Sequence, residues 1–304
     1  MLKVASESKS VIIRPGTEKR WAYKNVLGCG LSFLFIFTAF LGLQSLQSSI
    51  NFEGSLGTAS LVVLYVFFVL VGFVSPSILR ILGTKYSLVA GFICHIFYTL
   101  ANFYPSWYTL IPSSVAVGAA SPLIWAAVNS HLVEVALLVA PRLKVDQNHL
   151  ISTYTGIFFC FVQVGHIPGN LASSLILFPY GNSTLDDSQT CDATGGRDFE
   201  LKFLYILCSV YTLSVVIGIV FAVLLISHLK PTISAFLSSN QKFKEFFKEP
   251  FLELLRVLKD IKMVLIAPIS IFNGLEQAFA FGTFTVSAHG HYFALTITFL
   301  AGHH

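Results

Sequence analysis

The sequence predicts an all-α polytopic membrane protein, and three observations support that fold class. Hydrophobic residues make up 55% of the chain and charged residues 11%, whereas soluble domains carry about a quarter charged residues. The mean hydropathy is +0.74. The charged residues lie between long apolar runs instead of along one face of amphipathic segments, which excludes an ordinary soluble core.

Seven apolar stretches reach the length of about 20 residues that a helix needs to cross a bilayer. They lie at 26–46, 58–79, 86–104, 107–128, 154–178, 203–227 and 263–284. The predicted organisation is a basic cytosolic tail over 1–24, a six-helix bundle over 25–228, an amphipathic cytosolic loop over 229–262, a seventh transmembrane helix over 263–285 and a divergent tail over 286–304.

The distribution of lysine and arginine predicts the topology. The segments on the side of the N-terminus hold 17 of these residues and the segments on the opposite side hold 2, so the positive-inside rule places the N-terminus in the cytosol. The first 24 residues are polar and basic, and the apolar run after them is too long for a signal peptide. The net charge of +4 therefore reflects topology, and no nucleic-acid partner is predicted.

A glycosylation motif supports the same topology. The only Asn-x-Ser/Thr motif in the chain begins at Asn182, in the acidic 180–202 loop that the charge distribution places outside the cytosol. We therefore expect Asn182 to carry a glycan.

The fifth predicted span carries a face of small residues. Gly165, Gly169 and Ser173 follow one another at four-residue spacing, and such a face lets another helix approach closely. We expect it to pack helices, either within this bundle, which is the commoner use, or against a partner protein.

Two sets of polar residues lie inside predicted spans. Gln44 and Gln47 share one helical face at the outer end of the first span. Glu276 lies near the middle of the seventh span beside Asn273 and Gln277, where an ionised carboxylate is costly without a partner or a proton. We expect these residues to be buried, either in interhelical hydrogen bonds or along a solute path in which Glu276 couples a proton.

The loop over 229–262 is predicted to contain an interfacial helix. Phe251, Leu254, Leu255 and Leu258 repeat at the spacing of one helical face, and Pro250 marks its start. Phenylalanines and lysines alternate in the residues before it, a composition suited to the cytosolic leaflet of the lipid bilayer.

Motifs for chemistry are missing from the sequence. It contains no phosphate-binding glycine loop, paired CxxC, HExxH or nucleophile elbow, so no enzyme, cofactor or metal site is predicted. His95 and His166 are single imidazoles within spans, and we expect them to be neutral and hydrogen-bonded. His131, with Asn129 and Glu134, is expected to form scaffolding at the cytosolic end of the fourth span.

Several segments resemble a known family. Six spans, a cytosolic amphipathic loop and a seventh span resemble the first half of a major facilitator transporter. Five segments look like the uncoordinated-ninety-three-like (Unc-93-type) branch of that superfamily: 42–49 (GLQSLQSS), 106–112 (SWYTLIP), 154–159 (YTGIFF), 169–171 (GNL) and 274–279 (GLEQAF). The resemblance extends from about residue 24 to residue 285.

The sequence departs from that pattern in two ways. The basic loop signature that the superfamily has after the second span remains only as Arg80, Gly83 and Lys85, without its usual acidic residue. The family usually has about twelve spans, whereas seven are predicted here. We therefore expect a C-terminally truncated member whose tail is unrelated to the family.

The resemblance implies an accessory membrane protein in the plasma or endosomal membrane. Such a protein regulates an ion (potassium) channel complex or the trafficking of another membrane protein, such as a receptor. The alternative is a secondary transporter of a small solute, proton-coupled through Glu276, if a second half exists, because one half alone cannot perform alternating access. A seven-helix receptor is the third hypothesis. The predicted cytosolic N-terminus argues against it, and a glycan on Asn182 would exclude it, because in a receptor the loop between the fifth and sixth spans is cytosolic.

Overall fold

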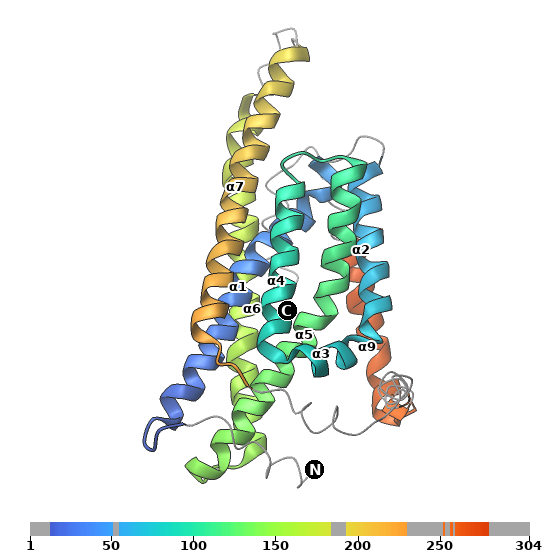
Figure 1. The fold of residues 1–304 in the computed structure, drawn as a ribbon. Coiled ribbons are helices and arrows are strands. Elements are labelled where there is room, and N and C mark those ends of the chain that lie inside the picture. The colour runs from blue at the N-terminus through green and yellow to red at the C-terminus, as the bar shows by residue number, and fades with distance from the viewer. Residues whose placement is uncertain are drawn as a thin grey trace.

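Helices are the only regular secondary structure in the described part of the chain. The structure, a computed structural model, describes residues 13–50, 55–183, 193–229, 252, 256–257 and 259–279, with side chains over 13–44, 55–169, 171, 204–229, 252, 256–257 and 259–279. The helices are α1 (Glu18–Ile50), α2 (Leu56–Gly72), α3 (Ser75–Leu82), α4 (Thr84–Ala101), α5 (Trp107–Leu143), α6 (Gln147–Ser183), α7 (Ala193–Leu225) and α9 (Ile261–Ala278) (Figure 1). The predicted fold class is confirmed.

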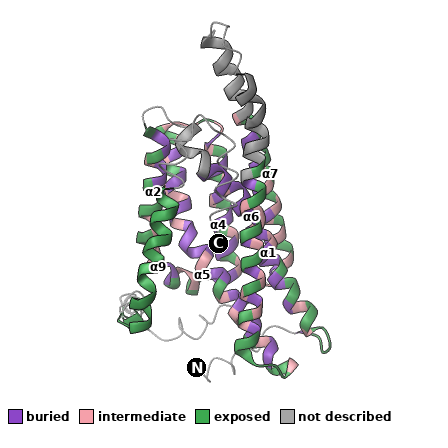
Figure 2. Ribbon diagram, turned by 180° about the vertical axis from the view of Figure 1, so that it is seen from behind, coloured by how far each residue is buried: buried purple, intermediate pink, exposed green. Residues whose placement is uncertain are grey.

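The long helices pack side by side into one bundle. α1 lies along α6 and α7, while α5 lies along α2 and α4. Contacts between α4 and α7, between α5 and α6, and between α1 and α5 join these two groups. Buried residues line the faces that meet inside the bundle, whereas α9 is exposed along its whole described length (Figure 2).

Four of the described helices, α1, α5, α6 and α7, are each long and apolar enough to cross a membrane. The pair α2 and α3 passes the same test together, which makes five candidate spans. α4 and α9 occupy the places of the predicted third and seventh spans but do not pass, and each carries polar residues, such as His95 in α4 and Glu276 in α9. The predicted count of seven therefore stays a prediction for these two.

The predicted second span, 58–79, is not one straight helix. α2 and α3 meet at an angle of 71°. Pro76 lies in the first turn of α3, and because proline has no N–H it cannot donate to the carbonyl of Gly72, four residues earlier. The hydroxyl of Ser75 donates to that carbonyl instead, at 3.0 Å.

An aromatic cluster fills the centre of the bundle. Phe33 of α1 is fully buried. Its ring lies 5.5 Å from Phe92 of α4, 5.4 Å from Trp125 of α5 and 4.9 Å from Phe158 of α6, with edge-to-face geometry in each pair. Each such pair adds about 0.5–1.5 kcal/mol to the attraction from buried area alone, so four helices are held together at one level.

Candidate functional site

A buried polar network joins four segments at one end of the bundle. We call it the Asn25 network, and it consists of Asn25 (α1), Thr84 (α4), His131 (α5) and Ser227, which follows α7. Asn25 and His131 are both fully buried. The Asn25 side-chain oxygen accepts from the backbone N–H of Ser227 at 2.7 Å and from Nε2 of His131 at 3.2 Å. Nδ1 of His131 lies 3.0 Å from the hydroxyl of Thr84.

The network defines the tautomer of His131. The backbone N–H of Ser227 can only donate, so the Asn25 atom that faces it is the oxygen. That oxygen cannot donate to His131, so Nε2 carries the proton, and the neutral ring accepts from Thr84 through Nδ1. Neutral His131 therefore uses both ring nitrogens, and Asn25 adds a bond from its amide nitrogen to the carbonyl of Trp21 at 2.8 Å.

The remnant of the basic loop signature lies beside this network. Gly83 connects α3 to α4 with a φ of +76°, a conformation that favours glycine over any other residue. The ammonium group of Lys85 donates to the carbonyl of Val223 at 2.9 Å. That carbonyl is in the last turn of α7, where unpaired carbonyls attract a cation. Arg80 is exposed in the last turn of α3.

A second polar group, the Gln44 cluster, lies toward the other end of α1. It comprises Gln44, Tyr65 of α2, and His95 and Tyr98 of α4. Gln44 is 2% exposed and its amide nitrogen donates to the hydroxyl of Tyr65. Asn25 and Gln44 are 19 residues apart on one helix, a rise of about 28 Å. The two polar groups are thus separated by about the thickness of a hydrocarbon core.

One polar atom of the Gln44 cluster has no hydrogen-bond partner in the described structure. His95 bonds the carbonyl of Gly91 through Nδ1 at 2.9 Å, but its buried Nε2 has no partner among the described residues. The ring of Phe40 lies 5.3 Å from that of His95 and 6.1 Å from that of Tyr98. Unpaired buried polar atoms are costly, so this cluster is a place where a polar guest such as water would be stabilised.

The small-residue face of α6 packs against α1. A Cβ atom on Gly165 would lie 3.0 Å from the carbonyl oxygen of Leu34, and one on Gly169 would overlap the carbonyl oxygen of Thr38. The hydroxyl of Thr38 donates to the carbonyl of Gly165 at 3.1 Å. These two glycines are therefore covered from within the chain, which leaves that part of the face closed to a partner protein.

The polar residues of α9 are exposed. The structure places Asn273, Glu276 and Gln277 on a helix with no buried residue, so the expected burial of these three side chains is wrong for the described structure. The physical reason is that a side chain is buried only where another element covers it, and no described element covers α9. Proton coupling by Glu276 remains only a prediction.

Several predicted residues lie outside the described side chains. Gln47, Ser173 and Asn182 belong to helical segments whose side chains are not described, and most of the 229–262 loop is not described either. Among the residues whose side chains are described, no group of three His, Cys, Asp or Glu side chains is arranged to hold a metal ion.

Sequence reasoning missed Asn25, the centre of the Asn25 network. A single asparagine near a basic tail carries no pattern, and its partners are 106 and 202 residues away. His131 was expected to be scaffolding, and its position between α1 and α4 agrees with that expectation. The only sequence feature that could have drawn attention to Asn25 is its position directly before the first apolar run, which begins at residue 26.

Long apolar helices around an aromatic centre, with buried polar groups near both ends, define a multi-pass α-helical membrane protein. Residues 49–300 match the family described as "Ion channel regulatory protein UNC-93". The chain belongs to this family, and the resemblance stated from the sequence is confirmed. The match continues past residue 285, so the expectation of a tail unrelated to the family is wrong as far as residue 300.

Sequence similarity to known proteins extends across most of the chain. "Protein unc-93 homolog A" of Xenopus laevis is 37% identical over 284 residues, which cover 87% of this chain and 60% of that protein. "Putative potassium channel regulatory protein unc-93" of Caenorhabditis elegans is 30% identical over 300 residues, 89% of this chain and 41% of that protein. "UNC93-like protein 3" of Arabidopsis thaliana is 27% identical over 255 residues, 84% of this chain and 51% of that protein. The chain thus spans about three fifths of the length of the Xenopus relative.

Proposed function

We propose that this chain is an accessory membrane protein that regulates an ion channel complex, with a potassium channel as the first class to test. Membership of a family described as ion channel regulatory carries the proposal. The name of the Caenorhabditis elegans relative, which specifies a potassium channel, supports the choice of ion.

The interior of the bundle favours a regulator over a pore. Phe33, Phe92, Trp125 and Phe158 meet at one level from four helices. Closely packed rings leave no room for a hydrated ion along the axis of the described bundle. Regulation of a separate conducting protein agrees with this closed interior. The chain could act on the gating of that protein or on its trafficking, and we include both in the proposal.

The test is co-expression with potassium channels of different classes, each recorded as whole-cell current with and without the chain. We expect the current of at least one class to change about twofold or more, since a shift of that size corresponds to well under 1 kcal/mol in the gating equilibrium. The partner should co-purify with the chain from cross-linked membranes. If no class changes in current and none co-purifies, the proposal fails.

A transporter is the competing function, and Glu276 separates the two. Uptake of a solute into liposomes that contain the purified chain, abolished by Glu276→Gln, would favour proton-coupled transport. For an accessory protein we expect Glu276→Gln to leave channel modulation unchanged, because this carboxylate is exposed on α9.

We also propose that the N-terminus is cytosolic and that Asn182 carries a glycan on the opposite side of the membrane. α6 has 37 residues, a length of about 55 Å, which exceeds the hydrocarbon core of about 30 Å. Its end near Asn182 therefore has room to project beyond the bilayer. We expect digestion with an endoglycosidase to increase gel mobility, and Asn182→Gln to abolish that shift.

A designed motif on the opposite side is the matched control. Lys144 and Asp146 are exposed between α5 and α6, and the double change Lys144→Asn and Asp146→Thr creates an Asn-x-Thr motif there. In the Asn182→Gln background this motif should remain unmodified. Glycan on the new motif in this background would mean that the proposed topology is inverted.

A further inference from the structure

α4 and α7 run antiparallel along a common seam. At one end of the seam the ammonium group of Lys85 bonds the carbonyl of Val223, and the rings of Tyr86 and His228 lie 5.0 Å apart. At the other end the ring of Phe103, just after α4, stacks on that of Tyr205 in α7 at 6.2 Å. The two helices therefore stay adjacent over most of the bundle.

Lys24 and Lys85 flank the Asn25 network at this end of the seam, because Lys24 precedes Asn25 on α1, Lys85 follows Thr84 on α4, and His131 bonds both Asn25 and Thr84. Burial of Lys85, and then the positive charge of Lys24 on α1, lower the pKa of Lys85. None of the carboxylates whose side chains are described forms an ion pair with either lysine. The carbonyl of Val223 occupies one of the three N–H donors of Lys85, so two donors have no partner among the described residues.

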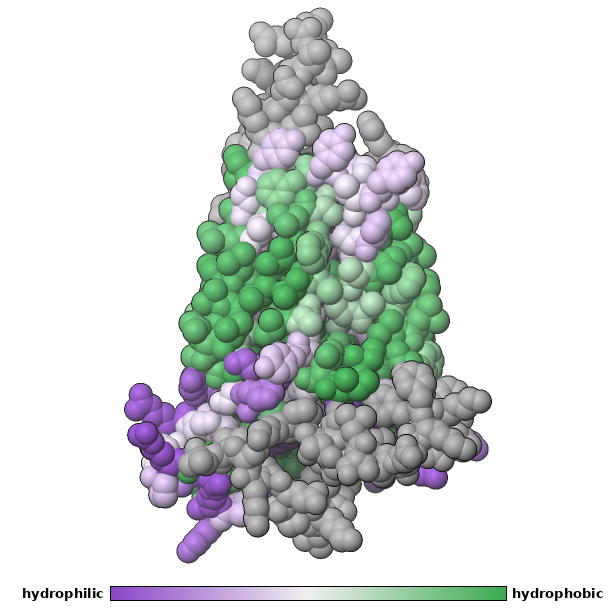
Figure 3. All heavy atoms as spheres, viewed as in Figure 1, coloured by the Kyte–Doolittle hydropathy of each residue, from purple (hydrophilic) through white to green (hydrophobic). Residues whose placement is uncertain are grey.

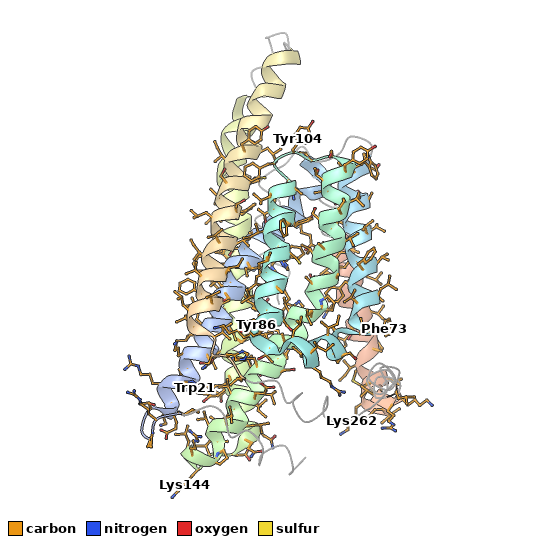
Figure 4. The ribbon with its side chains drawn as sticks, viewed as in Figure 1. Trp21, Phe73, Tyr86, Tyr104, Lys144 and Lys262 are labelled. Atoms are coloured by element: carbon orange, nitrogen blue, oxygen red, sulfur yellow. The ribbon has the colours of Figure 1, made fainter. Side chains whose placement is uncertain are left out.

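An apolar surface continues from these lysines along the seam. α4 exposes Ile93, Phe97 and Leu100 at helical spacing, and α7 exposes Val216, Val220 and Leu224. Figure 3 shows a broad apolar band across this face, with hydrophilic residues gathered below it at the level at which Figure 4 labels Tyr86 and Trp21. Lys24 and Lys85 thus lie at the boundary between the apolar band and the hydrophilic residues below it.

We propose that this seam binds a phospholipid with an anionic headgroup, whose phosphate is held by Lys24 and Lys85 and whose acyl chains lie along the exposed side chains of α4 and α7. Like charges held together without a carboxylate are complemented by an anion. The apolar surface beside them favours a lipid over a free phosphate, because a free phosphate has no acyl chains that could contact this surface. Under the proposed topology this lipid belongs to the cytosolic leaflet, which is rich in anionic lipids.

The test is a titration of the purified full chain in detergent with dioleoyl-phosphatidylserine or dioleoyl-phosphatidylcholine, followed by native mass spectrometry. We expect phosphatidylserine to bind more tightly than phosphatidylcholine. The double variant Lys24→Gln and Lys85→Gln should bind phosphatidylserine about tenfold more weakly, because two cations near a membrane surface contribute at least that much.

Lys144 and Lys262 provide a charge-matched control, because both are exposed and lie away from Tyr86 in Figure 4. The double variant Lys144→Gln and Lys262→Gln should keep phosphatidylserine affinity within about twofold of the original. The pair Lys24→Arg and Lys85→Arg should restore most of the binding, which separates loss of charge from misfolding.

Three outcomes would overturn the proposal. Equal losses in the two glutamine pairs would mean a general attraction between charges and not a site. Equal binding of phosphatidylcholine and phosphatidylserine would remove the role of the anionic headgroup. Displacement of the lipid by glycerophosphoserine, which lacks acyl chains, at a similar concentration would assign the lysines to a free anion.

Discussion

Replacing Asn25 by alanine is expected to lower the free energy of unfolding by about 2–4 kcal/mol. The side-chain oxygen of Asn25 accepts from both Nε2 of His131 and the backbone N–H of Ser227. Alanine removes that oxygen and leaves the buried Nε2 of His131 and the half-buried N–H of Ser227 without this acceptor. Each unpaired buried donor costs about 1–3 kcal/mol. The measurement is thermal unfolding of the purified chain in detergent. Unfolding is monitored as the loss of the monodisperse peak in size-exclusion chromatography.

Asn129 offers a close control for this variant. Its amide nitrogen donates to the carbonyl of Trp125, four residues earlier, at 2.9 Å, as that of Asn25 does to Trp21 at 2.8 Å. Asn129 is exposed, however, and makes no interhelical bond in the described structure. Asn129→Ala should therefore change stability by about 0.5 kcal/mol or less. Similar losses in the two variants would show that the interhelical bonds contribute little.

A double-mutant cycle isolates the bond between Asn25 and His131. His131→Ala removes the donor that Asn25→Ala leaves unpaired, so the two losses should overlap instead of adding. We expect a coupling energy of about 1 kcal/mol or more between these two positions. Strict additivity would mean that the two residues act independently.

The sequence was sufficient to predict the class of fold and the family, because both depend on features that persist over many residues. Each predicted span overlaps a described helix, and the segment 42–49 carries the family resemblance into α1. The bend between α2 and α3 was missed, because hydropathy averaged over 58–79 does not reveal a break. Ser75 and Pro76 were its local indication.

The polar contacts were harder to predict, for two different physical reasons. The hydrogen-bond partners of Asn25 in other segments are distant in sequence. A single sequence does not reveal which distant residues contact one another. Glu276 was expected to be buried from the cost of a carboxylate in lipid. That cost says that a partner or proton is needed but does not say which element supplies it, and α9 is uncovered in the described structure.

Gly169→Ala is expected to destabilise the bundle by about 1–3 kcal/mol. The added methyl group would overlap the carbonyl oxygen of Thr38, so α6 must move away from α1. That movement also lengthens the 2.8 Å bond from the hydroxyl of Tyr211 to the carbonyl of Gly169. The expected loss exceeds the gain of about 1 kcal/mol that alanine usually brings to a helix interior. Thermal unfolding in detergent measures the net change.

A series of glycines on the same helix makes this prediction specific. A Cβ atom on Gly156 would meet nothing within 4 Å, whereas one on Gly165 would lie 3.0 Å from the carbonyl oxygen of Leu34. Alanine at 156 should therefore stabilise the helix by up to about 1 kcal/mol, alanine at 165 should be intermediate, and alanine at 169 should be the most damaging. Helix propensity alone predicts that all three substitutions stabilise equally. A graded loss that follows the approach of α1 can arise only from close packing between the two backbones.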